Sequence, residues 1–308
     1  MSRAMTSLAL SFAAFAAYGY ATSAYALGLT REARASDAAA RGVIDSLSLA
    51  LPVSATIGYL AMCALAPRVM ATREAFEPKS AMTAYNAYQT AFNVVVLWMF
   101  IDEVRGLGLR VWGERMPWSD KRSVRIMLGI WLHYNNKYLE LLDTVFMIAR
   151  KKTQQLSFLH VYHHALLIWA WWYVCYLMAS NDCIDAYFGA ACNSFIHIVM
   201  YSYYLMSALG VPCPWKRYIT QAQMAQFVIV FAHAVYVLKQ KHCPVSLPWA
   251  QMFVMANMLV LFGNFYLKSY GVGTKPLRAA APARSPVANP SSSASPPVRR
   301  ARSARKTA

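Results

Sequence analysis

The chain has 308 residues, of which 58% are hydrophobic and only 14% are charged. A soluble domain carries nearer a quarter charged residues, and the mean hydropathy of this chain is +0.31. The composition therefore excludes an ordinary soluble protein and indicates a membrane protein. The net charge of +17 would permit a nucleic-acid partner, but basic flanks facing anionic lipid explain the same residues, so we expect no nucleic acid.

The chain begins with an apolar stretch over residues 5–29, directly after Arg3. It ends near Ala24-Tyr25-Ala26, a pattern typical of a cleavable secretory signal, although the stretch is longer than an ordinary signal core. It could equally be an eighth helix or a signal anchor. We assign residues 1–42 to this apolar segment and a lumenal link.

Seven further apolar segments follow, each near the length of about 20 residues that crosses a bilayer as a helix. They cover residues 43–66, 82–101, 124–148, 156–178, 186–209, 218–238 and 248–267. Strands or loops exposed to lipid would leave backbone polar groups unpaired. We therefore predict an all-α polytopic membrane protein with seven transmembrane helices in a domain over residues 43–270.

The last 38 residues, 271–308, are rich in Pro, Ser, Ala and Arg and contain no acidic residue, which predicts a disordered basic tail. Lys and Arg collect on the cytosolic side of membrane proteins. The tail and three short loops place their basic residues on one side, whereas the basic loop between the second and third spans contradicts this assignment. We place the C-terminus in the cytosol.

Six cysteines are present, and none shows the pair spacing of a metal site. Cys183 and Cys243 are expected on the same lumenal side, where a disulfide is permitted. Two unlinked thiols fit the sequence at least as well.

The third span carries charged residues. His133, Lys137, Glu140 and Thr144 are spaced to share one face of a helix, and Asp143 flanks that face. Charges inside a membrane are tolerated when they pair or face a polar cavity. The pattern is compatible with a structural ion-pair cluster between helices and with a catalytic role.

The fourth span contains three histidines in a stretch, residues 153–181, that has no Asp, Glu, Lys or Arg. The spacing of His160, His163 and His164 places their rings on one helical face. A helix running on from Lys152 would carry the rings about 12 to 18 Å beyond the basic residues. A lone histidine usually packs in a core, but three on one face indicate chemistry.

The fifth and sixth spans add polar side chains. Asn193, His197, Tyr201 and Tyr204 share a face of the fifth span, although tyrosines such as Tyr203 and Tyr204 also anchor helices at membrane interfaces. The amides near the start of the sixth span could join helices or line a channel for a polar ligand.

Three interpretations of the histidines follow. The HxxHH pattern resembles one box of the membrane di-iron desaturases and hydroxylases, but those enzymes need more histidines than the seven of this chain, one of which is in a loop. A single metal site remains an alternative. Without a metal, imidazole can attack a thioester and carry the acyl group. A seven-helix transporter or receptor would need no chemistry.

Four segments then resemble, in order and at similar intervals, the signatures of the ELO family of fatty acid elongases. They are Lys137-Tyr-Leu-Glu140-Leu-Leu-Asp143-Thr144, Phe158-Leu-His160-Val-Tyr-His163-His164, Asn193-Ser-Phe-Ile-His197-Ile-Val-Met200-Tyr201-Ser-Tyr203-Tyr204 and Thr220-Gln-Ala-Gln223-Met-Ala-Gln226-Phe227. The resemblance covers about residues 51–270 and is weak before Tyr85.

The resemblance implies seven helices, six of which form a barrel around a closed acyl tunnel, and the activity of a 3-oxoacyl-CoA synthase. Such an enzyme condenses acyl-CoA with malonyl-CoA and needs neither a cofactor nor a metal. His163 would carry the acyl group as a covalent imidazole adduct. The other expected catalytic residues are His160, His164, His197, Lys137, Glu140 and Asp143.

The same resemblance and the basic loops indicate where substrate binds. The expected residues are Lys137, Arg150, Lys152, Gln155, His160, Asn193, Tyr201, Tyr203, Tyr204, Lys216, Thr220, Gln223 and Lys268. Those at the cytosolic mouth would receive the phosphates of CoA. Expected partners are the lipid bilayer and the ketoacyl reductase, dehydratase and enoyl reductase of the elongation cycle. The expected location is the endoplasmic reticulum membrane, and a homodimer is compatible with it.

Overall fold

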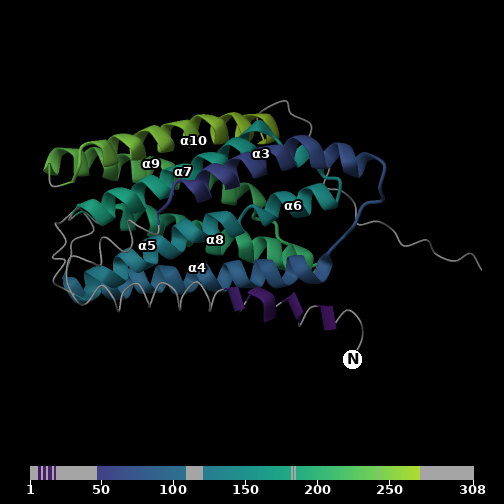
Figure 1. Cartoon of the computed structure of the whole chain (residues 1–308), viewed down its shortest axis with the longest axis horizontal. Coiled ribbons are helices and arrows are strands. Elements are labelled where there is room, and N and C mark those ends of the chain that lie inside the picture. Colours follow the sequence, from purple (N-terminus) through teal and green to yellow (C-terminus); the bar gives the residue numbers. More distant parts are fainter. Residues whose placement is uncertain are drawn as a thin grey trace, which may run out of the picture.

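The structure is a computed structural model that describes residues 47–108, 121–181, 183, 185–241 and 243–270, with a few positions between 6 and 18. Its elements in these ranges are α3 (Ala50–Ala71), α4 (Lys79–Leu107), α5 (Lys121–Leu139), α6 (Leu142–Ala149), the 3-10 helix η2 (Thr153–Gln155), α7 (Phe158–Ser180), α8 (Ala186–Ala208), α9 (Lys216–Gln240) and α10 (Ser246–Tyr270). They form an elongated bundle in which α9 and α10 lie together on one side and α4 on the opposite side (Figure 1). The predicted all-helical fold is confirmed.

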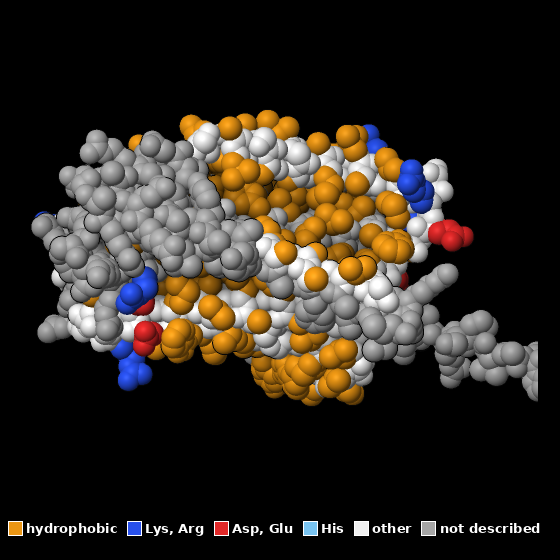
Figure 2. Space-filling view, turned by 60° about the horizontal axis from the view of Figure 1, so that its bottom comes forward, with side chains coloured by type: hydrophobic (Ala, Val, Ile, Leu, Met, Phe, Trp, Pro, Cys, Tyr) orange, Lys and Arg blue, Asp and Glu red, His pale blue; other side chains and the backbone are white. Residues whose placement is uncertain are grey.

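Membrane character is clearest in three helices. Within the described ranges, α3, α9 and α10 are long and apolar enough to cross a membrane. Figure 2 shows hydrophobic side chains spread over the middle of the visible face, while charged side chains gather toward the ends. Large apolar side chains such as Trp98, Phe253 and Val260 are exposed, as expected of a surface in contact with lipid.

The third predicted span is not one helix. The expected helix over residues 124–148 is wrong, because α5 ends at Leu139 and α6 begins at Leu142. At the break, the backbone N–H of Asp143 donates to the carbonyl of Glu140 at 3.1 Å, three residues back rather than four. Glu140 therefore lies between two helices, where side-chain contacts determine its orientation.

The start of α7 also differs from the expectation. Residues 152–157 contain the short η2 helix, and α7 begins only at Phe158. The hydroxyl of Ser157 accepts a hydrogen bond from the backbone N–H of His160 at 3.3 Å, which caps the helix. A continuous helix from Lys152 is therefore wrong, and the three histidines lie in the first two turns of α7.

The packing that supports this arrangement is centred on α4. This helix is about 43 Å long at 1.5 Å per residue and lies along α5 and α8. Its Phe100 packs in a core with Ile130 of α5, Met178 of α7 and Ala190 of α8. A Cβ atom on Gly129 would lie 2.8 Å from the Phe100 ring, so glycine permits the close approach of α4 and α5.

The N-terminal stretch is helical at the positions described between Thr6 and Tyr18. The ring of Phe15 lies 5.7 Å from that of Tyr85, and the Tyr18 hydroxyl donates to the carbonyl of Asn135 at 3.4 Å. These contacts favour an additional helix beside α4. The rest of residues 1–46, including the expected cleavage site, and the basic tail over residues 271–308 lie outside the described residues.

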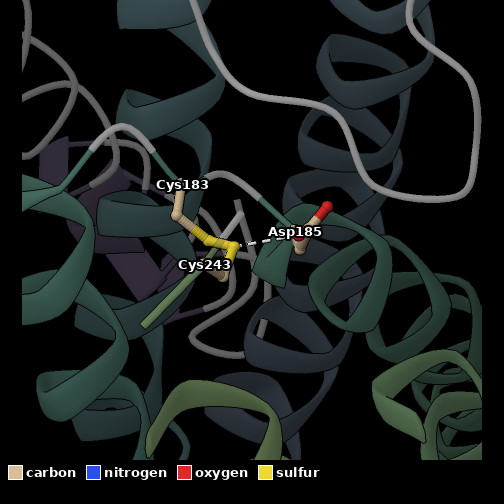
Figure 3. A group of neighbouring side chains, drawn as sticks. All are labelled: Cys183, Asp185 and Cys243. Atoms are coloured by element: carbon tan, nitrogen blue, oxygen red, sulfur yellow. Dashed lines mark hydrogen bonds between the residues drawn. A yellow bond between two sulfur atoms is a disulfide. The ribbon is translucent and has the colours of Figure 1, made fainter. Parts of the chain in front are cut away.

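A disulfide joins two of the connections between helices at one end of the bundle. Cys183, between α7 and α8, is bonded to Cys243, between α9 and α10, with their Cα atoms 5.3 Å apart (Figure 3). The buried Asp185 places its Oδ2 atom 2.9 Å from Cys243 Sγ. The pairing that the sequence left open is therefore present, and both cysteines lie on one side, as predicted.

Removing this bond is expected to destabilise the protein. The two cysteines are 60 residues apart, and closing a loop of that length stabilises a fold by about 4 kcal/mol in the chain-entropy account. We expect the Cys183→Ser/Cys243→Ser variant to unfold at a clearly lower temperature in detergent without reductant. Cys213→Ser, which removes a free cysteine, is the control and should keep the wild-type Tm. Equal Tm values for all three proteins would contradict the prediction.

Candidate active site

Glu140 is at the centre of a buried polar cluster. Only 1% of the residue is exposed, and its Oε1 atom accepts hydrogen bonds from Lys137 Nζ at 2.7 Å and Asn136 Nδ2 at 3.1 Å. His197 Nδ1 of α8 lies 3.3 Å from the same oxygen. A buried ion pair is tolerated only when its charges have such partners. The expected convergence of Lys137, Glu140 and His197 is therefore present.

Lys137 connects this cluster to a second residue of α8. Its Nζ atom also donates to Asn193 Oδ1 at 3.1 Å, and only 2% of the lysine is exposed. Asn193 and His197 are one turn apart on α8, so both face the α5–α6 break. The structure therefore brings Asn193 together with the charged pair.

The three histidines of α7 form a contiguous group, as their spacing predicts. The ring centroid of His164 lies 4.5 Å from that of His160 and 5.4 Å from that of His163. His160 Nε2 is hydrogen-bonded to Thr144 Oγ1 at 2.8 Å, which links α7 to α6. His163 Nδ1 lies 3.2 Å from Met258 Sδ of α10. The group thus lies between α6 and α10.

Asp143 takes part through a tyrosine. The hydroxyl of Tyr201 donates to Asp143 Oδ2 at 2.8 Å, and Tyr201 is only 1% exposed. Tyr204 is 39% exposed and Tyr203 is half-buried beside it. Tyr201 therefore belongs to the buried cluster, whereas Tyr203 and Tyr204 lie toward the outside of α8.

The residues expected to bind CoA lie at one end of the bundle. Arg150 and Lys152 follow α6, Gln155 lies in η2, Lys216 starts α9 and Lys268 lies near the end of α10 (Figure 1). Gln155, Lys216 and Lys268 are exposed, and Arg150 and Lys152 are half-buried. Across the described ranges no hydrogen bond links these side chains to one another. What they share is their position near the ends of helices on the same side of the bundle.

Two further residues of this group lie inside the bundle. Thr220 is buried, and Gln223 Nε2 of α9 lies 3.7 Å from Met200 Sδ of α8. They face the helix that carries His197 rather than the open end of the bundle. Their position fits a lining between the basic end and the histidines.

Comparison with known proteins covers the region that contains this cluster. Residues 46–278 match the family described as ELO: GNS1/SUR4 family. The chain belongs to the ELO family. It is 36% identical over 229 residues to very long chain fatty acid elongase 5 of Bos taurus, covering 70% of this chain and 72% of that protein. It is 31% identical over 239 residues to elongase 7 of Rattus norvegicus, covering 74% and 84%, and 36% identical over 219 residues to elongase 2 of Mus musculus, covering 70% and 74%.

This ELO protein also has buried polar residues that the sequence analysis missed. On α4, Tyr85, Asn86, Gln89 and Asn93 are each at most 4% exposed. Gln89 Oε1 accepts a hydrogen bond from Asn136 Nδ2 at 2.8 Å, so α4 contacts the cluster around Glu140. The signal was present, because these residues recur at helical spacing of three and four in an otherwise apolar span.

His133 lies one turn before Lys137 on the predicted face of α5, and its ring packs between helices. It is fully buried, its ring centroid lies 4.5 Å from that of Trp171, and its Nδ1 lies 3.4 Å from Ser194 Oγ. The residue packs between α5, α7 and α8.

The arrangement of donors bears on the metal alternative for this ELO protein. Within the described ranges, the group of three His, Cys, Asp or Glu residues whose ligand atoms converge is Cys183, Asp185 and Cys243, and its two sulfurs are joined in the disulfide. The histidine nitrogens instead face Thr144, Met258 and Glu140. This geometry does not favour the di-iron interpretation.

Proposed function

We propose that this chain condenses an acyl-CoA with malonyl-CoA and that His163 carries the acyl group between two half-reactions. The protein is a fatty acid elongase of the 3-oxoacyl-CoA synthase type. The products are a 3-oxoacyl-CoA longer by two carbons, CoA and carbon dioxide. The observation that carries the proposal is the grouping of three imidazoles beside the buried Lys137–Glu140 pair, within the region that matches the family.

In the first half-reaction, a nitrogen of His163 attacks the carbonyl carbon of the acyl thioester. The contact of His163 Nδ1 with Met258 Sδ supports Nε2 as the attacking atom, because a thioether only accepts a hydrogen bond and so keeps the proton on Nδ1. The carbon–sulfur bond breaks, and the departing CoA thiolate takes the proton that the imidazole loses. The product is an acyl-imidazole, itself a reactive acyl donor.

In the second half-reaction, malonyl-CoA loses carbon dioxide, and its carbon–carbon bond electrons remain as an enolate. The enolate carbon attacks the acyl carbonyl, a new carbon–carbon bond forms and the bond to His163 breaks. The imidazole recovers one proton from the medium. We assign stabilisation of the enolate oxygen and proton handling to His160, His164 and His197, which surround the reacting centre.

Lys137, Glu140 and Asp143 act on these histidines without carrying the acyl group. The Glu140 carboxylate lies 3.3 Å from His197 Nδ1, which supports a role in orienting that ring. Lys137 holds the carboxylate in place at 2.7 Å. Asp143 orients Tyr201 through the 2.8 Å hydrogen bond.

The substrate enters from the end that carries the basic residues. We propose that the CoA phosphates bind to Arg150, Lys152, Gln155, Lys216 and Lys268, since the segments that carry these residues lie at one end of the bundle. Thr220, Gln223 and Tyr201 then line the path toward the histidines, and Asn193 lies beside Lys137. The histidines start α7, close to that end, so a CoA outside the bundle can present its thioester to them.

We further propose that all seven predicted spans cross the membrane and that six of them surround a closed acyl tunnel. The disulfide supports an orientation with Cys183 and Cys243 in the oxidising lumen of the endoplasmic reticulum and the basic end in the cytosol. The reductases and the dehydratase that complete elongation are the proposed partners, because the 3-oxo product needs reduction, dehydration and a second reduction.

The decisive assay uses purified protein, labelled malonyl-CoA and acyl-CoAs of short, medium and long chain. We expect a labelled 3-oxoacyl-CoA with two additional carbons and release of one carbon dioxide for each product molecule. Absence of product with every chain length would overturn the proposed function.

A further inference from the structure

Gln89 is a buried amide in a helix from which the catalytic residues are absent. It is fully buried near the middle of α4, and both ends of its side chain are used. Its Oε1 accepts from Asn136 Nδ2 at 2.8 Å, and its Nε2 donates to the Tyr85 hydroxyl at 3.4 Å. An amide inside a membrane protein costs free energy unless it is bonded in this way.

The side-chain oxygen of Gln89 is connected to Glu140 through hydrogen bonds of Asn136. The Asn136 Nδ2 group that donates to Gln89 also donates to Glu140 Oε1 at 3.1 Å. With its amide held by α4, Asn136 presents a second donor to the carboxylate oxygen that Lys137 also contacts. The carboxylate oxygen that faces His197 is therefore held by groups from α5 and, through Asn136, from α4.

The side-chain nitrogen of Gln89 is connected to Asp143 through hydrogen bonds of Tyr85 and Tyr201. The Tyr85 hydroxyl is hydrogen-bonded to the Tyr201 hydroxyl at 3.2 Å, and Tyr201 donates to Asp143 Oδ2 at 2.8 Å. A continuous chain of hydrogen bonds thus joins the two carboxylates through α4 and α8. Glu140 and Asp143 are only three residues apart, but they lie at the break between α5 and α6, where the backbone lacks the regular bonding of a helix.

We propose that Gln89 is a positioning residue that couples the orientation of Glu140 to that of Asp143. It acts through Asn136 and Tyr85 and does not touch the substrate. Hydrogen-bonded networks of this kind fix the geometry of the groups that react. The inference rests on the proposed function of the site.

The test compares two variants of α4 that each replace an amide by an apolar side chain of similar size. Gln89→Met removes both hydrogen bonds of the network. Asn93→Leu, one turn further along, is the control, because Asn93 is equally buried but its amide donates to the backbone carbonyl of Gln89 at 2.8 Å. We expect Gln89→Met to lower kcat about 10- to 100-fold with an unchanged KM for acyl-CoA, at a Tm close to that of Asn93→Leu. Asn93→Leu should keep kcat within about threefold of the wild type.

A double variant separates positioning from general damage. Since Gln89 acts in part through Asn136, the loss of kcat in Gln89→Met/Asn136→Ala should be clearly smaller than the product of the losses in the two single variants. Independent, multiplying losses would overturn the proposal, as would a Gln89→Met enzyme that behaves like Asn93→Leu.

A milder substitution guards against a variant that does not fold. Gln89→Asn keeps an amide but withdraws it by one methylene, so that the 2.8 Å contact with Asn136 is lost. It should show the same selective loss of kcat, and wild-type kcat in this variant would overturn the proposal. If the wild type itself makes no 3-oxoacyl-CoA, the proposed function fails, whereas an active wild type with an insensitive Gln89 refutes the inference alone.

Discussion

The His163→Ala variant is expected to form no detectable 3-oxoacyl-CoA, a loss in kcat of at least about 1000-fold. The acyl group would have no nitrogen to occupy, and the neighbouring rings are held elsewhere. His160 Nε2 is bonded to Thr144 at 2.8 Å, and the ring centroid of His164 lies 5.4 Å from that of His163. Turnover with labelled malonyl-CoA measures the loss.

The same variant tests the covalent intermediate directly. Wild-type protein incubated with acyl-CoA alone should gain the mass of one acyl group on the peptide that contains residues 158–180, and His163→Ala should not. The matched control is His233→Gln, which replaces a buried histidine of α9 whose ring centroid lies 4.3 Å from that of Phe188. This control should keep the adduct and lose less than about tenfold in kcat. An adduct that persists in His163→Ala would assign the acyl group to another residue.

The sequence predicts where the helices lie more accurately than it predicts where a helix is interrupted. Long stretches without charge are expected to form helices in lipid, and each predicted span contains a described helix. The break after Leu139 had no local signal, because residues 133–148 contain neither Gly nor Pro. It accompanies tertiary contacts of Glu140 with His197 and of Asp143 with Tyr201, which no single helix pattern encodes.

The start of α7 did have a signal. Ser157 precedes the first residue of the helix, in the position where a hydroxyl caps the free N–H groups. The glutamines of η2 have good helix propensity, so the sequence before Phe158 also resembles a helix and the start of α7 is hard to locate. Because α7 begins at Phe158, the histidines lie close to the end of the bundle that carries the basic residues.

For the site, spacing predicts which side chains share a face but not which helix they meet. The expected grouping of His160, His163 and His164 is present, and so is the pairing of Lys137 with Glu140. The contribution of α4 could not be assigned in this way, because Gln89 and Asn136 are 47 residues apart and meet only after the helices pack. The same holds for Cys183 and Cys243, for which the sequence indicates a shared side but not a distance.

Replacing Lys137 by Met is expected to destabilise the protein as well as inactivate it. The substitution keeps the volume of the side chain but leaves Glu140, 1% exposed, without its cation. Removing one partner of a buried ion pair costs about 3–5 kcal/mol, because the remaining charge stays desolvated. In detergent the Tm should fall by on the order of 10 °C. Lys239→Met, which removes an exposed lysine at the end of α9, should leave the Tm unchanged.

The double variant Lys137→Met/Glu140→Gln separates the effect on folding from that on catalysis. In the wild type, Asn136 Nδ2 lies 3.1 Å from Glu140 Oε1, and the neutral amide introduced by Glu140→Gln can still accept this hydrogen bond. No charge then remains unpaired at this position. We therefore expect its Tm to lie well above that of Lys137→Met, while both variants lose at least about 100-fold in kcat. A double variant as unstable as the single one would mean that Lys137 supports the fold by packing alone. If turnover recovered together with the Tm, the charges would serve stability and not the reaction.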